Sequence, residues 1–147
     1  PSPAPEDVEA HASRHLRVGW TALLVFVVLG VVLEALHAYR APLYLDAGQE
    51  GRRLLLRLAH AHGTLLGVVN VLYGLTARAV PAVARRWTSA GLVAAVVLVP
   101  SGFLLGGVFA RGADPGVGAA LVPAGAIALV VSIGAIVARL RGPTRSP

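Results

Sequence analysis

The chain has 147 residues, of which 56% are hydrophobic and only 14% charged, and its mean hydropathy is +0.72. Because soluble domains usually carry about a quarter charged residues, this composition indicates a membrane protein. The chain contains no cysteine, which excludes disulfide bonds, thiolate metal sites and thiol nucleophiles.

The net charge of +6 comes with thirteen basic residues, all of which are arginine. A strongly basic chain raises nucleic acid or anionic lipid as a partner. Here the arginines stand at the ends of apolar runs, where they mark membrane boundaries, and no basic stripe or nucleic-acid-binding motif is present. We therefore expect a lipid bilayer as the partner and no nucleic acid.

Four apolar runs, each bounded by charged residues, account for most of the chain. A bilayer core about 30 Å thick needs roughly 20 apolar residues in a helix, and each run is long enough. We predict transmembrane helices over residues 18–39, 57–77, 87–110 and 115–138. The polar residues 1–17 before them predict a short interfacial helix. The expected fold is a single all-α polytopic domain over 1–147, with the four helices in an antiparallel bundle.

The N-terminal segment carries three possible metal ligands. Asp7, His11 and His15 are four residues apart, so they share one face of a helix. Two imidazoles one turn apart can bind one transition metal ion. The alternative interpretation is a solvated interfacial helix that binds no ligand.

The junction between the first two runs holds the strongest candidates for a cofactor site. Glu34 and His37 stand near the end of the first run, and Arg57 and His60 stand at the start of the second. An ionisable side chain inside apolar sequence is costly, so it is a functional candidate with a partner. Adjacent antiparallel helices can direct His37 and His60 into one gap, where haem or a metal ion is a possible cofactor. Glu34 and Arg57 would then tune or anchor that cofactor.

His60 and His62 do not form a chelating pair on a regular helix. Each residue advances the helix by about 100°, so these two side chains point about 200° apart. His60 shares its face with Gly63 and Gly67, whose spacing lets another helix approach closely, and with Asn70. We expect Asn70 to form a hydrogen bond across that helix contact. Gly102 and Gly106 repeat the same spacing in the third run.

Four spans place both termini on one side of the membrane. The N-terminal segment, the second loop and the tail carry eight arginines, and the other two loops carry five. The positive-inside rule therefore favours cytoplasmic termini. We expect an integral protein of the bacterial inner membrane.

No catalytic motif is present, neither the G-x-S-x-G of serine hydrolases nor the H-E-x-x-H of zinc proteases. The function expected first is a non-catalytic accessory subunit or a homo-oligomeric bundle, whose partners are other membrane subunits or copies of itself. In that interpretation the polar junction only fixes the ends of helices. The alternatives are haem or metal binding through His37 and His60, and proton, quinone or small-solute handling through Glu34.

Overall fold

The computed structural model describes residues 4–45, 48–111 and 114–141. Within these residues the protein is all-helical, without β-strands, and four helices are long and apolar enough to cross a membrane. These are α1 (Pro5–Ala38), α3 (Glu50–Ala79), α4 (Arg86–Val108) and the segment Val117–Leu140, which joins η2 (Val117–Ala120) to α5 (Leu121–Leu140). The short helices are α2 (Pro42–Leu45) and η1 (Pro81–Val83). The prediction of an all-helical fold with four helices long and apolar enough to span a membrane is confirmed.

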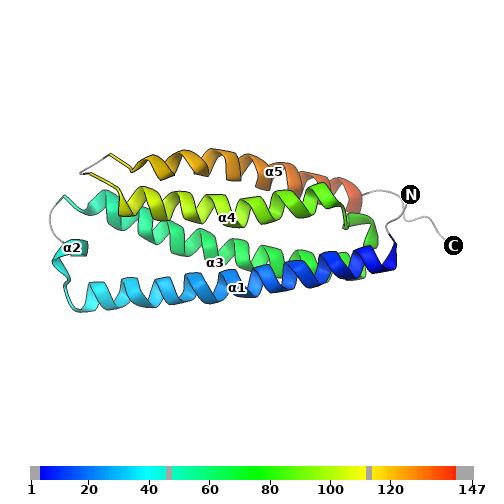
Figure 1. Cartoon of the computed structure of the whole chain (residues 1–147), viewed down its shortest axis with the longest axis horizontal. Coiled ribbons are helices and arrows are strands. Elements are labelled where there is room, and N and C mark those ends of the chain that lie inside the picture. Colours follow the sequence, from blue (N-terminus) through cyan, green and yellow to red (C-terminus); the bar gives the residue numbers. More distant parts are fainter. Residues whose placement is uncertain (1–3, 46–47, 112–113, 142–147) are drawn as a thin grey trace.

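The four long helices lie side by side, and successive helices run in opposite directions (Figure 1). α3 packs against α1 and α4, whereas α5 packs mainly against α4. α1 makes far less contact with α4 than with α3, although α1 and α4 begin at the same end of the molecule (Figure 1). The arrangement is therefore a chain of pairwise contacts in which α3 and α4 occupy the middle.

The N-terminal segment differs from the expected separate interfacial helix. Residues Pro5–Ala38 form one continuous helix of 34 residues, with a proline in its first turn. No proline or glycine interrupts the chain between Pro5 and Gly19, so nothing ends the helix at the boundary expected near residue 17. A helix of this length is roughly 51 Å long and exceeds the bilayer core of about 30 Å. The charges mark the end of the apolar region, not the end of the helix.

Small residues bring α1 and α3 into close contact. A methyl group on Gly19 would lie 2.7 Å from the carbonyl oxygen of Gly67, and one on Gly67 would lie 3.1 Å from that of Gly19. The ring of Phe26, further along α1, covers Gly63. The backbones can approach this closely only because neither glycine carries a side chain.

A second close contact joins α4 to the segment that leads into α5. A methyl group on Gly102 would lie 3.2 Å from the carbonyl oxygen of Gly118, and one on Gly106 would lie 3.2 Å from Cβ of Ala119. All the glycines expected to pack helices therefore lie at helix contacts, those of α3 against α1 and those of α4 against η2.

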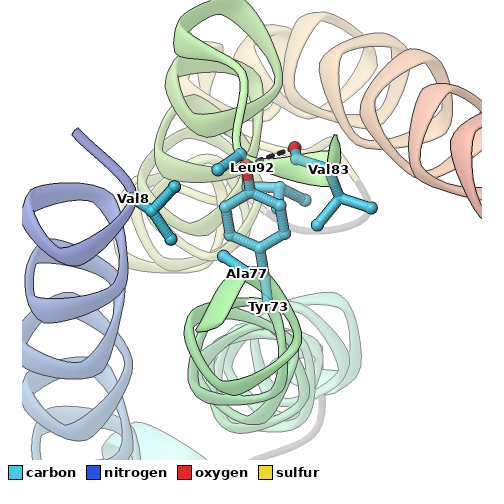
Figure 2. Packing of buried hydrophobic residues seen from close by; sticks show 6 residues of the cluster. Val8, Tyr73, Ala77, Val83 and Leu92 are labelled. Carbon is cyan, nitrogen blue, oxygen red and sulfur yellow. Dashed lines mark hydrogen bonds between the residues drawn. The ribbon is translucent and has the colours of Figure 1, made fainter. Parts of the chain in front are cut away.

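A hydrophobic cluster closes the end of the bundle where α1 begins. Figure 2 shows Tyr73 and Ala77 of α3 between Val8 of α1 and Leu92 of α4, with Val83 of η1 beside them. The Tyr73 hydroxyl donates a hydrogen bond of 3.1 Å to the carbonyl oxygen of Val83 (Figure 2). This bond gives a buried phenol a partner, as burial in an apolar environment requires, and it ties η1 to α3.

The glycine contact between α1 and α3 is open to a direct test. We expect Gly19→Ala to lower the free energy of unfolding by about 1–3 kcal/mol, because the methyl group would meet backbone atoms that cannot move aside. Reversible unfolding in mixed micelles measures this loss. Val28→Ala, at an exposed position of the same helix, is the control. Equal stabilities of the two variants would contradict the close contact.

Candidate functional site

A recess at the hairpin between α1 and α3 contains all four residues expected to hold a cofactor. Glu34 and His37 come from α1, and Arg57 and His60 come from α3. The recess has a volume of about 380 Å³, and Tyr44 of α2 also lines it. Its remaining wall is apolar and is formed by Val27, Gly30, Val31 and Leu33. We call it the histidine recess.

His60 is held in a notch of α1. Its Nδ1 donates a hydrogen bond of 2.6 Å to the carbonyl oxygen of Phe26. One turn further along, a methyl group on Gly30 would overlap the imidazole ring, so the ring fits only because that residue is glycine. Within the part of the chain that the structure describes, the second ring nitrogen, Nε2, has no hydrogen-bond partner. A neutral imidazole that donates through Nδ1 presents Nε2 as a lone-pair ligand.

The residues that line the histidine recess differ in exposure. Glu34, His37 and Arg57 are exposed, whereas His60 is half-buried and Tyr44 is only 1% exposed. The recess therefore combines an apolar wall, one oriented imidazole and a charged mouth. Tyr44 was not singled out from the sequence, because its burial depends on α2 folding back between the long helices.

A second polar site is buried near the opposite end of the bundle. His15 of α1, Asn70 of α3 and Ser89 of α4 form this group, which we call the His15 cluster, and His15 is 0% exposed. The Asn70 amide nitrogen donates to the carbonyl oxygen of Leu66 at 2.9 Å, which directs its amide oxygen toward His15. Asn70 Oδ1 then accepts from His15 Nδ1 at 2.7 Å, and His15 Nε2 accepts from the Ser89 hydroxyl at 2.8 Å. Both nitrogens of the imidazole are therefore satisfied.

Aromatic contact completes the enclosure of His15. The Tyr73 ring meets it edge to face, with ring centroids 4.5 Å apart and planes at 76°. Asn70 thus forms the hydrogen bond across a helix contact that its position indicated, but Ser89 was missed. The sequence signal that was overlooked is the spacing of Ala12, His15 and Gly19, which places these three residues on one face of the helix. In the structure all three are buried.

The structure does not gather the three candidate metal ligands of the N-terminal segment. His15 faces the bundle interior, while His11 uses Nδ1 in a hydrogen bond of 2.6 Å to the backbone oxygen of Asp7. In the described ranges, no group of three or more His, Asp or Glu side chains is arranged to hold a metal ion. The geometry therefore gives no support to a metal site formed by Asp7, His11 and His15.

The two histidines of α3 point to opposite sides, as their angular separation predicts. His60 contacts α1, whereas His62 lies beside Phe103 of α4 with ring centroids 4.9 Å apart. His62 Nδ1 donates to the backbone oxygen of Leu58 in its own helix at 2.9 Å. His62 therefore takes no part in the histidine recess.

The His15 cluster predicts a measurable contribution to stability. We expect Asn70→Ala to cost about 1–3 kcal/mol of unfolding free energy, because it leaves the buried Nδ1–H of His15 without an acceptor. Thr76→Val on the same helix is the control, since the Thr76 hydroxyl bonds only to the backbone of its own helix. Unfolding curves that coincide for these two variants would show that the cluster does not contribute.

The two polar sites differ in what they can do chemically. The His15 cluster is internally satisfied and offers no free donor or acceptor on its imidazole, which fits a role in joining helices. The histidine recess contains an imidazole whose Nε2 has no hydrogen-bond partner among the described residues, together with an apolar wall, which fits ligand binding. Comparison of the chain with protein-family models, with curated proteins and with solved structures found no match.

Proposed function

We propose that the protein is an integral membrane subunit without catalytic activity of its own, and that it binds haem in the histidine recess. The observation that carries this proposal is the setting of His60. Histidines that ligate metal centres donate their other ring nitrogen to a carbonyl or carboxylate, which fixes the tautomer and orients the ring. The hydrogen bond from His60 to Phe26 is of this kind.

The remaining residues of the recess suit haem better than a bare metal ion. Haem iron needs only one or two axial ligands from the protein, and His37 is the candidate second ligand beside His60. Arg57 at the rim is suited to pair with a propionate, and the apolar wall is suited to contact the porphyrin. Glu34 adds a carboxylate at the mouth, so proton or quinone handling at the same recess is the alternative function.

We also propose an orientation in the bacterial inner membrane. The first turns of α1, the segment around η1 and the last turn of α5 lie at one end of the molecule (Figure 1). This end carries the larger share of the arginines, so the positive-inside rule places it in the cytoplasm. The polar first turns of α1 then project from the membrane on the cytoplasmic side.

The role as a subunit is supported by the outer face of α5. Ile127, Val130 and Gly134 share one face of this helix and are exposed, and a methyl group on Gly134 would meet nothing. Small residues on a transmembrane helix allow another helix to approach. We propose that this face meets a second copy of the chain or another membrane subunit.

An absorption spectrum of the purified full chain tests the haem proposal. We expect a Soret band after haem supplementation, and we expect His60→Ala to reduce it at least tenfold because the axial ligand is lost. A high-spin shift in His37→Ala would identify the second ligand. His62→Ala is the matched control, since it removes an imidazole from the same helix but from the opposite side.

Two results would contradict haem binding. One is the absence of a Soret band in the wild-type protein after supplementation. The other is an equal band in His60→Ala and His62→Ala, with circular dichroism showing that both variants are folded.

The mass of the protein in mild detergent tests the subunit role. We expect at least twice the protomer mass of 15.1 kDa, or a co-purifying membrane protein. Gly134→Trp should abolish the association by filling the α5 face, while Leu24→Trp, at an exposed position of α1, should preserve it. A monomeric wild-type protein without a co-purifying partner would rule this role out.

A further inference from the structure

The weak contact between α1 and α4 leaves a groove on the side of the bundle away from the histidine recess. The groove has a volume of about 510 Å³. Its wall is mainly apolar and includes Val18, Thr21, Val25 and Phe26 of α1 and Val97 and Ser101 of α4. α1 and α4 run in the same direction (Figure 1), and both contribute residues to the groove.

The groove ends in a cluster of positive charge. Arg14 and Arg17 lie at this end, and Arg14 also lines an adjoining hollow of about 460 Å³ together with Arg86 and Trp87. Neither hollow is lined by an Asp or Glu of the described residues. Arg14 and Arg86 form no ion pair within the described ranges, whereas Arg78 of α3 pairs with Glu9 of α1 at 2.6 Å.

The dimensions of the groove match one leaflet of a bilayer. Arg14 and Phe26 are twelve residues apart on α1, a rise of roughly 18 Å. Half of a hydrocarbon core about 30 Å thick is roughly 15 Å. Trp87 stands at the charged end, where indole rings mark the boundary between headgroups and acyl chains.

We propose that this groove is a binding site for an anionic phospholipid. Arg14, Arg17 and Arg86 bind the phosphate, and one acyl chain lies along Val18, Val25 and Phe26. Basic pockets between transmembrane helices recognise anionic headgroups in this way. A free phosphate would use the arginines but not the apolar wall, and a neutral lipid would use the wall but leave the arginines without counter-ions.

Native mass spectrometry of the full chain tests the proposal. The protein is reconstituted in nanodiscs of equal parts phosphatidylglycerol and phosphatidylcholine, and the lipids that remain bound on release are counted. We expect the ratio of bound phosphatidylglycerol to bound phosphatidylcholine to be on the order of 10:1, against 1:1 in the nanodisc, because two or three arginines favour the anionic lipid. Bound lipid in the bulk proportion would overturn the proposal.

Two variants separate the headgroup site from the acyl site. The double variant Arg14→Gln with Arg86→Gln should bring the ratio of bound lipids close to the bulk proportion. The control is Arg139→Gln with Arg141→Gln, which removes the same amount of charge at the same end of the bundle. This control should preserve the enrichment of phosphatidylglycerol. Val25→Trp fills the groove from an exposed position and should lower the amount of retained phosphatidylglycerol several-fold while the arginines remain. Equal enrichment in the two double variants, or full retention in Val25→Trp, would also overturn the proposal.

Discussion

The close approach of α1 to α3 is the contact on which both polar sites depend. Gly19 and Gly67 let the two backbones touch, and this brings His15 within hydrogen-bond distance of Asn70. Further along the same interface, Gly30 leaves the notch in which His60 reaches the carbonyl oxygen of Phe26. Helices separated by larger side chains would form neither hydrogen bond. In an apolar environment the loss of these hydrogen bonds would strongly destabilise the fold, because an unsatisfied polar group there has no water to replace its partner.

The two histidines on this interface differ in how many of their ring nitrogens form hydrogen bonds. His15 donates through one ring nitrogen and accepts through the other, so its polar capacity is fully used within the protein. His60 has the same donor role, but its other nitrogen has no hydrogen-bond partner within the described part of the chain, and the residue lines a recess with an apolar wall. The first arrangement ties three helices together, and the second leaves a ligand position. This contrast separates a structural polar site from a candidate binding site in a chain with few polar side chains.

Span number and approximate position follow from the sequence because bilayer thickness requires apolar runs of a certain length, and four runs met that requirement. Helix ends were less predictable, since the charges before Val18 mark the membrane boundary without ending α1. The rotation of each helix was harder still, because uniformly apolar spans give little periodic signal. His15 was therefore assigned to an exposed face with Asp7 and His11, although it is buried. The sequence did allow one grouping to be predicted, because an antiparallel hairpin brings the end of one helix beside the start of the next. This grouping consists of Glu34, His37, Arg57 and His60.

His60 and His15 differ in whether Nε2 has a hydrogen-bond partner among the described residues, and this difference can be measured. Nitrogen-15 NMR of the full chain, labelled at histidine, measures each imidazole separately. We expect that both rings carry a proton at Nδ1, and that adding haem changes the Nε2 resonance of His60 while that of His15 stays in place. A change at His15 with none at His60 would contradict this expectation.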